Sequence, residues 1–370
     1  MEGLVLPDYN NSICNIINDL LSIFNIENGG KKLGIDIKYG KKTSFVFLDG
    51  LGWNLYSKLK TNFNSLKISS VFPSSTDTAT VSIVSGLTPG MHGVVGYKAF
   101  IKKAGAIVKP LENTYASSFH SVNLLNSGRM KDMFNINTIF NTLSKKKIKN
   151  LVITPNFTAN SSFSSLIFSG STYVEGYDNI WDAFHMYRKA MDNNNIKFVY
   201  LYIPYIDTIE HMYGYDSIEA YEAADYIINK IWEINKNLKT NTVISADHGH
   251  KVVDELIDFS GDKKLIRKLE IPPYGDSRAP LFRSRYDIKY ELNKYKMKIF
   301  DKTERELLLG KIGKNVEDIL PDYIGAAIGS TGFTFNYKLK NGNKKERYGE
   351  PISNHGGLSP DEMEVPILTL

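Results

Sequence analysis

Three aspartates in this sequence each stand directly after an apolar, β-branched run that is typical of a buried strand. They are Asp49, Asp207 and Asp247, and the last is followed at once by His248. In an open sheet of parallel strands, ligands bind outside the carboxyl ends of the strands. The positions therefore predict that three strands deliver carboxylates, one of them with an adjoining imidazole, to a single edge of one sheet.

Two further histidines, His211 and His355, extend this set of polar side chains. His211 stands four residues after Asp207, a spacing that puts both side chains on one face of a helix, close enough to share an ion. A mixed set of carboxylates and imidazoles suits zinc or manganese. Cations between the carboxylates would also relieve their mutual repulsion. The residues together predict a divalent metal site.

Each piece of this pattern has an ordinary structural alternative. A strand-end aspartate often caps a helix or closes a turn. The pair Asp207 and His211 has the spacing of a surface ion pair, and Asp247-His248-Gly249 has the composition of a turn. Only the conjunction of all of them favours the metal site over these alternatives.

A hydroxyl-rich segment follows another expected strand and opens a helical pattern. It carries Ser74, Ser75, Thr76 and Thr78. A hydroxyl at a helix N-terminus lies among free N–H groups and in a helix dipole that favour negative charge, which suits an alkoxide and an incoming phosphate. A serine or threonine N-cap is the structural alternative. Physical reasoning alone does not separate the four hydroxyls.

Strand-like and helix-like segments alternate along most of the chain. This rhythm predicts an α/β fold with a mostly parallel central sheet and helices on both faces. The expected strands are Thr43–Leu48, Leu66–Phe72, Asn150–Thr154, Lys197–Ile203 and Asn241–Ala246, and the expected helices are Leu51–Leu59, Thr78–Gly86 and Ser217–Ile234.

We interpret residues 1–370 as one domain. Two additions to its α/β core are expected. Tyr97 to Pro110 predicts a hairpin that turns near Gly105. From about Pro272 the alternation of strand-like and helix-like segments changes. Roughly residues 275–340 are expected to form a small inserted cap beside the face of the sheet edge that carries the candidate ligands. Arg278 and Arg283 stand at the start of this insertion, where surface arginines are expected.

The bulk composition is that of an ordinary globular protein of 370 residues, with 42% hydrophobic and 23% charged residues. No apolar run approaches the roughly 18 residues needed to cross a bilayer, and the first residues lack the basic region of a secretory signal, so a cytoplasmic protein is expected. The single cysteine, Cys14, excludes an internal disulfide and a cysteine-based zinc site. The net charge of +5 is mild, and Lys145-Lys146-Lys147 is not interleaved with aromatics, which argues against a nucleic-acid groove.

These motifs together resemble the alkaline phosphatase superfamily, in particular its type I phosphodiesterase/nucleotide pyrophosphatase branch. The resemblance runs in unbroken order from Asp49 to His355. It is carried by Phe-Leu-Asp49-Gly-Leu-Gly, Phe-Pro-Ser-Ser-Thr76, Ser-Gly86-Leu-Thr-Pro-Gly-Met-His92-Gly, Asp207-Thr-Ile-Glu-His211, Ala-Asp247-His248-Gly and Asn-His355-Gly-Gly.

The resemblance implies a role for each matching residue. The ten-residue spacing back from Gly86 selects Thr76 as the nucleophile. One ion would be held by Asp49, Asp247 and His248 and would touch the Thr76 oxygen, and the other would be held by Asp207, His211 and His355. The implied cofactors are two divalent ions, zinc first and manganese as the alternative.

One position departs from the family pattern. An asparagine commonly donates to the phosphoryl oxygen after the His-Gly segment, and Tyr97 followed by Lys98 occupies that place here. Either side chain could bind substrate in its stead, or both could merely begin the hairpin. His92 and His250 are expected to be structural or to support the ligands.

The implied function is hydrolysis of a small-molecule phosphate ester or nucleotide through a phospho-threonine, with a phosphodiesterase or nucleotide pyrophosphatase first. The departure at Tyr97 keeps a phosphomonoesterase or phosphonate hydrolase open. A metal-binding regulatory module without turnover is the alternative from another class. The sequence leaves the oligomeric state open.

Overall fold

The computed structural model describes residues 3–36, 42–61, 63–117, 130, 134, 136–337 and 351–370. Within these ranges, no helix combines the length and the apolar character that a membrane span requires.

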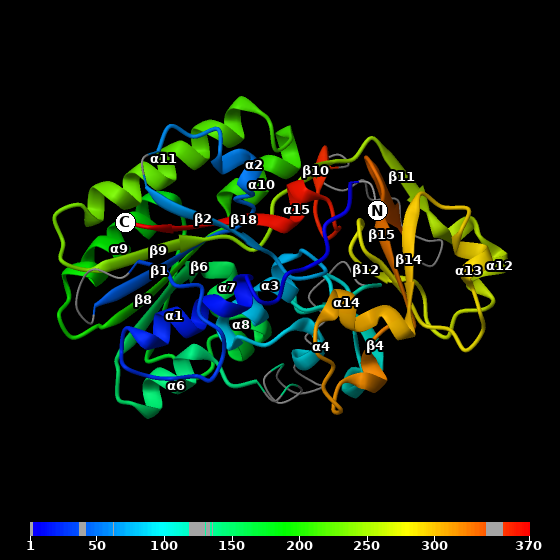
Figure 1. Ribbon diagram of the computed structural model, residues 1–370, viewed down its shortest axis with the longest axis horizontal. Coiled ribbons are helices and arrows are strands. Elements are labelled where there is room, and N and C mark those ends of the chain that lie inside the picture. Colours follow the sequence, from blue (N-terminus) through cyan, green and yellow to red (C-terminus); the bar gives the residue numbers. More distant parts are fainter. Residues whose placement is uncertain are drawn as a thin grey trace.

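A seven-stranded sheet forms the centre of the larger part of the molecule (Figure 1). Its strands are β1 (Thr43–Leu48), β2 (Asn64–Ser69), β6 (Asn150–Pro155), β7 (Tyr173–Tyr177), β8 (Phe198–Ile203), β9 (Asn241–Ser245) and β18 (Glu364–Thr369). They lie in the order β2-β18-β9-β1-β8-β6-β7. Only β18 runs antiparallel to its neighbours, β2 and β9. The predicted α/β fold with a mostly parallel sheet is confirmed.

The three strands that precede the aspartates are neighbours at the centre of this sheet. β1 is buried over its whole length, as its largely apolar run Thr-Ser-Phe-Val-Phe-Leu predicts for a strand covered on both faces. It pairs with β8 on one side and β9 on the other, with Leu48 opposite Ile203 and Phe47 opposite Ser245. The strands therefore end level with one another, and the residues that follow them meet at one edge.

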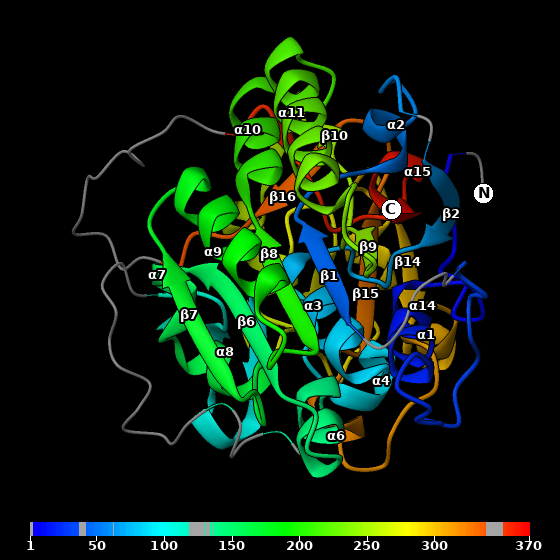
Figure 2. The same ribbon diagram turned by 90° about the vertical axis from the view of Figure 1, so that its left-hand side faces the viewer.

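Helices cover both faces of the sheet, as Figures 1 and 2 show. One layer consists of α2 (Trp53–Tyr56), α9 (Ile180–Asp192), α10 (Tyr205–Tyr213) and α11 (Ile218–Asn235). The other consists of α1 (Ile16–Ser22), α3 (Thr76–Ser85), α6 (Ile139–Lys145) and α8 (Ser162–Ile167). α11 buries Ala220, Ala224, Ile227 and Ile231 at helical spacing, which explains why its apolar stripe was readable in the sequence.

Several predicted boundaries are wrong by a few residues. The strand expected at Leu66–Phe72 is β2 and ends at Ser69, the helix expected at Leu51–Leu59 is the short α2, and α3 begins at Thr76 instead of Thr78. β7, α9 and β18 were not predicted. β7 is an exposed edge strand, so it lacks the apolar run by which the other strands were recognised.

β18 escaped prediction because it contains Pro366, a residue that argues against a central strand. Its pairing with β9 begins only at Ile367, so Pro366 contributes to no ladder hydrogen bond on that side. The carbonyl oxygen of Pro366 instead accepts a hydrogen bond of 2.8 Å from the Ser245 hydroxyl. A proline is thus accommodated in a strand that has neighbours on both sides.

A smaller part of the molecule lies beside the carboxyl edge of the sheet (Figure 1). Its antiparallel sheet has the order β12-β13-β15-β14, formed by β12 (Tyr274–Gly275), β13 (Pro280–Phe282), β14 (Met297–Asp301) and β15 (Tyr323–Ala327). α12 (Lys263–Ile266), α13 (Lys289–Leu292) and α14 (Arg305–Leu309) accompany it, and β11 (Glu255–Asp258) pairs with β16 (Thr331–Thr334). Most of these elements fall in the range 275–340, of which 338–340 lie outside the described residues. The assignment of that range as an inserted cap stays a prediction.

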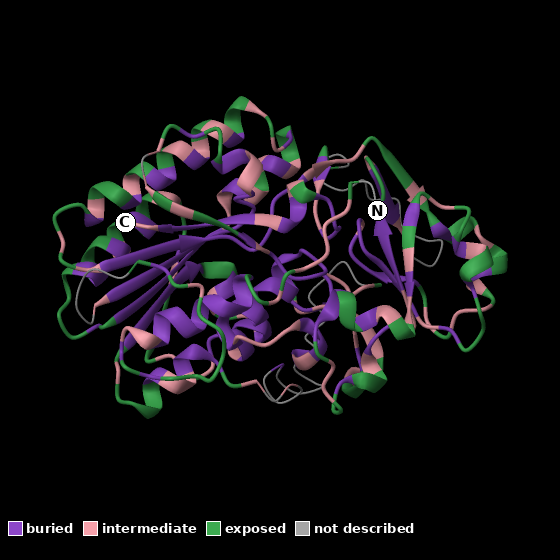
Figure 3. Ribbon diagram, in the orientation of Figure 1, coloured by how far each residue is buried: buried purple, intermediate pink, exposed green. Residues whose placement is uncertain are grey.

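Shorter elements connect the two parts. The predicted hairpin is present as β3 (Ala99–Ile101) and β4 (Ala106–Lys109), with Gly105 at the turn and β5 (Thr114–Tyr115) beside β4. The remaining elements are α4 (Pro89–His92), α7 (Asn156–Ala159), β10 (Lys251–Val252), β17 (Ser353–Asn354) and α15 (Pro360–Met363). Buried residues extend from the main sheet through these connections into the smaller sheet (Figure 3).

The expectation that Arg278 lies on the surface is wrong, because its side chain is fully buried. Nε and Nη2 of Arg278 donate to the two carboxylate oxygens of Glu362, at 2.9 and 3.0 Å. Nη1 donates to the carbonyl oxygens of Gly329 and Thr331. This fork-on-fork pair satisfies both charges and joins the smaller sheet to α15 of the larger part.

Replacing Arg278 by alanine leaves the Glu362 carboxylate buried without its partner. We expect Arg278→Ala to lower the free energy of unfolding by about 3–5 kcal/mol. Arg285→Ala is the control, because that side chain is 87% exposed and its loss changes stability by less than about 0.5 kcal/mol. Urea unfolding followed by circular dichroism measures both, and equal midpoints for the two variants would contradict the linking role of Arg278.

Candidate metal centre

Asp49, Asp247 and His248 bring their ligand atoms to within 4.8 Å of one another. His248 Nε2 lies 3.2 Å from Asp247 Oδ2 and 3.6 Å from Asp49 Oδ1. All three side chains are essentially closed to solvent. Asp247 Oδ2 has no hydrogen-bond partner among the described residues, although Asp247 Oδ1 accepts from the backbone N–H groups of Gly50 and His248. A buried carboxylate oxygen left without a donor is what a cation would satisfy.

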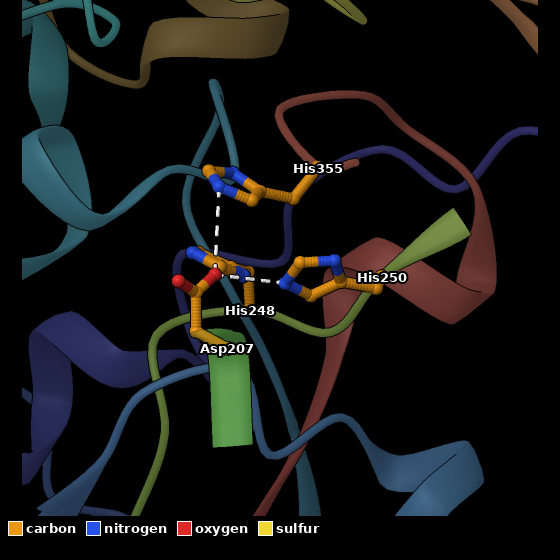
Figure 4. A group of neighbouring side chains, drawn as sticks. All are labelled: Asp207, His248, His250 and His355. Atoms are coloured by element: carbon orange, nitrogen blue, oxygen red, sulfur yellow. Dashed lines mark hydrogen bonds and ion pairs between the residues drawn. The ribbon is translucent and has the colours of Figure 1, made fainter. Parts of the chain in front are cut away.

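A second group gathers around the Asp207 carboxylate, at the beginning of α10 (Figure 4). Asp207, His248, His250 and His355 have ligand atoms within 4.8 Å of one another. Asp207 Oδ1 lies 2.8 Å from His250 Nε2, 3.3 Å from His211 Nε2 and 3.7 Å from His355 Nε2. The rings of His248 and His355 stack with centroids 3.8 Å apart, so the two groups are adjacent. The structure therefore brings together all six predicted ligands, and it adds His250.

The imidazoles are oriented by hydrogen bonds at Nδ1. His211 Nδ1 lies 2.9 Å from the Ser353 carbonyl oxygen, His355 Nδ1 lies 3.1 Å from the Ser74 carbonyl oxygen, and His248 Nδ1 lies 3.2 Å from the Gly249 carbonyl oxygen. A carbonyl oxygen only accepts, so Nδ1 carries a proton in each ring, and in the neutral ring Nε2 is the nitrogen with the free lone pair. Such outer contacts fix the tautomer that a metal ligand requires.

A glycine allows two of the ligands to approach. The Asp49 N–H donates to the Ile203 carbonyl and the Asp207 N–H donates to the Asp49 carbonyl, so the two loops run against each other. Gly50 has φ +82°, and a Cβ placed there would lie 2.8 Å from the Asp207 backbone. Any side chain at this position would push the Asp49 and Asp207 loops apart.

Thr76 is the first residue of α3, and its side chain faces the first group. Its Oγ1 lies 3.3 Å from Asp49 Oδ1 and 3.3 Å from His248 Nε2. The N-cap residue is Ser75, and no side chain makes a capping hydrogen bond there. The Thr76 hydroxyl therefore does not cap the helix. Its oxygen lies among the candidate ligand atoms of Asp49 and His248.

The electrostatics of the site follow from packing several acids and imidazoles in a buried space. Burial, followed by the charges of Asp247 and Asp207, raises the pKa of Asp49 well above its usual range. Burial, followed by His248 and His250, holds the pKa of His355 well below its usual range. An unprotonated imidazole is the form that binds a metal, whereas Asp49 would have to release a proton on binding one.

Tyr97 and Lys98 make their described contacts with the β3–β4–β5 segment and with the smaller part of the molecule. The Tyr97 hydroxyl donates to Glu112, and Lys98 Nζ lies over the rings of Tyr97 and Tyr337, 5.7 Å from each centroid. The Lys98 backbone exchanges hydrogen bonds with Gly275. Their role in substrate binding stays a prediction.

Sequence reasoning missed several residues that shape the site. The Tyr202 hydroxyl donates to Asp49 Oδ2, and Ser353 contacts both His211 and His250. Tyr202 lies near the carboxyl end of β8, which was a usable signal, whereas Ser353 follows a segment without regular pattern. His92, expected to be structural or supporting, is buried and bonds to Ser82 on α3, 2.9 Å from its hydroxyl.

Comparison with known proteins agrees with this geometry. The sequence model of the type I phosphodiesterase / nucleotide pyrophosphatase family matches residues 44–297, and the chain belongs to that family. Among curated proteins, no sequence matches this chain significantly.

Solved structures of the alkaline phosphatase superfamily share the fold. Murine ectonucleotide pyrophosphatase/phosphodiesterase 5 is similar with a TM-score of 0.64 and 16% identity, over 88% of this chain and 87% of its own. The human protein of that name gives the same score and identity, over 89% and 87% of the two chains. Phosphonoacetate hydrolase from Sinorhizobium meliloti 1021, in complex with phosphonoacetate, also has a TM-score of 0.64 and 16% identity, over 90% and 91%.

Divalent ions are expected to stabilise the folded chain, because the unfolded chain cannot bring the ligands together. An ion present at about 100 times its dissociation constant adds roughly 2.7 kcal/mol to the free energy of unfolding. Calorimetry of the protein with a chelator and then with zinc or manganese would show this as a rise in Tm. Asp247→Asn should reduce the rise, whereas Asp192→Asn, at an exposed position, should not. An unchanged Tm on metal addition would contradict the site.

Asp276 gives a pH dependence of stability that is separate from the metal ligands. Burial raises its pKa to about 7, although the Tyr97 N–H donates to its Oδ1. In the unfolded chain an aspartate has a pKa of about 3.9, so the folded state binds the proton more tightly. Its contribution to stability is full below about pH 4 and is lost as the pH rises to about 7.

Replacing Asp276 by asparagine removes this loss. As the pH rises from 4 to 8, the wild type should lose unfolding free energy relative to Asp276→Asn. The difference between the two should change by a few kcal/mol, on the order of 1.4 kcal/mol for each unit of pKa shift. Urea unfolding at several pH values measures the difference. Asp287→Asn, at an exposed position, corrects for the removal of an acid as such. Parallel curves for Asp276→Asn and the wild type would contradict the assignment.

Proposed function

We propose that this protein is a two-metal hydrolase of phosphate esters, acting as a phosphodiesterase or nucleotide pyrophosphatase with Thr76 as its nucleophile. The observation that carries the proposal is the Thr76 hydroxyl, which lies at the first residue of α3 and 3.3 Å from both Asp49 Oδ1 and His248 Nε2. A hydroxyl in that place meets both the positive end of a helix dipole and a set of metal-ligand atoms. Membership of the type I phosphodiesterase family supports the same reaction class.

In this proposal, Asp49, Asp247 and His248 hold one ion, and Asp207, His211 and His355 hold the other. Zinc and manganese both accept this mixture of oxygen and nitrogen donors. When bound, such a pair of ions supplies Lewis-acid polarisation of the phosphoryl oxygens and lowers the pKa of an adjacent hydroxyl.

The remaining steps are carried by the chain itself. Thr76 Oγ1, having lost its proton to solvent, attacks the phosphorus in line with the leaving oxygen. A Thr76 Oγ1–phosphorus bond forms and the bond to the leaving alcohol or phosphate breaks, with the leaving oxygen taking up a proton. A water molecule then attacks the phospho-threonine, which restores Thr76 and releases the phosphate product. Free backbone N–H groups at the start of α3 stabilise the negative charge on the phosphoryl oxygens.

A phosphonate hydrolase or phosphomonoesterase is the second candidate. It is favoured by the likeness in fold to phosphonoacetate hydrolase, which is as high as the likeness to the ectonucleotide pyrophosphatase. Turnover of a nitrophenyl phosphodiester, a nitrophenyl phosphomonoester and phosphonoacetate at saturating zinc or manganese separates the candidates. Full metal binding without turnover of any of the three would instead favour a regulatory metal-binding module. We also propose a cytoplasmic location, which fractionation of cells with an antibody to the protein would test.

Thr76→Ala is expected to lower kcat for the preferred substrate by at least about 10³-fold, the scale on which loss of a nucleophile is felt. Thr76→Ser is the matched control, since it keeps an oxygen at the same position and should retain measurable turnover. Both variants should bind two ions, as measured by elemental analysis after gel filtration. Equal turnover by Thr76→Ala and the wild type would overturn the proposed nucleophile.

A further inference from the structure

Two fully buried side chains beside Asp207 have no part in the function proposed above. They are Glu210, on α10, and His250, which follows the Asp247-His248 pair. No described residue gives either carboxylate oxygen of Glu210 a hydrogen bond. His250 Nε2 lies 3.5 Å from Glu210 Oε2, and the same nitrogen lies 2.8 Å from Asp207 Oδ1. One buried nitrogen therefore faces two carboxylates.

The hydrogen bonds around Ser353 determine which form His250 takes. The Ser353 hydroxyl lies 2.6 Å from the carbonyl oxygen of Glu210, and because a carbonyl only accepts, the single hydroxyl proton is donated there. His250 Nδ1 lies 3.1 Å from the same hydroxyl oxygen, so Nδ1 is the donor and carries a proton. In the neutral ring, Nε2 is then left with a lone pair that points at Asp207 and Glu210. A cation or a proton between these groups would relieve their repulsion.

The distances around Asp207 are those of donors that share an ion. Two donors about 2.1 Å from one ion lie about 3.0 Å apart at an octahedral angle and about 3.4 Å apart at a tetrahedral one. The observed separations of Asp207 Oδ1 from His250 Nε2 and His211 Nε2 are 2.8 and 3.3 Å. Figure 4 shows the rings of His250, His248 and His355 gathered around the Asp207 carboxylate. His250 thus occupies the position of a ligand as fully as His211 does.

We propose that His250 is a fourth protein ligand of the second metal ion, beside Asp207, His211 and His355, and that the buried Glu210 side chain supports His250 from outside the donor set. This inference rests on the proposed two-metal function and refines its second site. Glu210 lies outside the donor atoms that are within 4.8 Å of one another, so it is a neighbour of the site and not a ligand.

A four-residue donor set constrains which ion can work at this site. A catalytic tetrahedral zinc site keeps three protein ligands and leaves the fourth position for water or substrate. With four protein ligands, a tetrahedral ion has no position left. The second site must therefore take an ion with coordination number five or six, for which manganese is better suited than tetrahedral zinc.

The first test uses the wild-type protein loaded with two cobalt ions per chain. In proton NMR, imidazole N–H protons of cobalt-bound histidines undergo large contact shifts, and the buried Nδ1–H groups of this site exchange slowly enough to be seen. We expect four shifted N–H signals, from His211, His248, His250 and His355. Three signals would overturn the proposal, because they would make His250 a hydrogen-bonding support of Asp207 only.

Variants then assign the fourth signal and measure its effect on affinity. His250→Gln should remove one shifted signal and weaken binding of the second cobalt ion by more than about 100-fold, whereas loss of an outer support costs about 10–100-fold. Glu210→Gln should keep all four signals and weaken binding within that smaller range. His211→Ala is the positive control and His185→Ala, at an exposed position, the negative one. An unchanged spectrum in His250→Gln would overturn the proposal even if that variant binds less metal.

The outcomes separate this inference from the proposed function. Binding of fewer than two ions by the wild type, in titration calorimetry without substrate, would remove the two-metal function and the inference with it. Binding of two ions, with turnover but without a His250 signal, would remove only the inference.

Discussion

The Asp49, Asp207 and Asp247 carboxylates meet at the buried carboxyl edge of the central sheet, and their mutual repulsion is the constraint on which the rest of the site depends. Burial makes the conflict worse, since it raises the pKa of Asp49 in the same direction as the charges of Asp247 and Asp207 do. Three histidines surround these carboxylates. Their Nε2 atoms face inward because their Nδ1–H groups donate to the carbonyl oxygens of Ser353, Ser74 and Gly249. A site built in this way has the donor set that cations would satisfy.

The sheet topology explains how these groups arrive together. β9, β1 and β8 are adjacent and parallel. Their register makes the three strands end at the same edge of the sheet, so the residues that follow them lie at the same level along the strand direction. The chain after β16 adds what the strands cannot supply: His355 as a candidate ligand and Ser353 as the partner of two imidazoles. The same stretch contains Glu362, through which the buried Arg278 ties the smaller sheet to α15. The ligand edge and the junction between the two parts are therefore held by neighbouring residues.

The sequence predicted those features that depend on local pattern. The largely apolar runs of β1, β8 and β9 predicted the centre of the sheet, and the positions of the aspartates after them predicted that these side chains meet at one edge. β18 was not predictable, since Pro366 contradicts a central strand and is tolerated because the pairing with β9 begins only at Ile367. The burial of Arg278 depends on Glu362, 84 residues away, which no local pattern reveals. His250 is of the same kind, because its proximity to Asp207 follows from the packing of α10 against the segment after β9, whereas Glu210 stands three residues after Asp207 on α10 and its proximity follows from helical spacing.

The position of β18 has a consequence for how the chain reaches this structure. β18 lies between β2, which precedes it by most of the length of the chain, and β9, which precedes it by about a third of that length. Until it inserts, the inward edges of both strands have unpaired N–H and C=O groups. Such non-local pairing slows folding, and in the meantime the unpaired strand edges can pair with neighbouring chains. The yield of native protein would therefore be governed by competition between insertion of this strand and intermolecular association during synthesis, so that slower production or a holdase chaperone would favour the native fold.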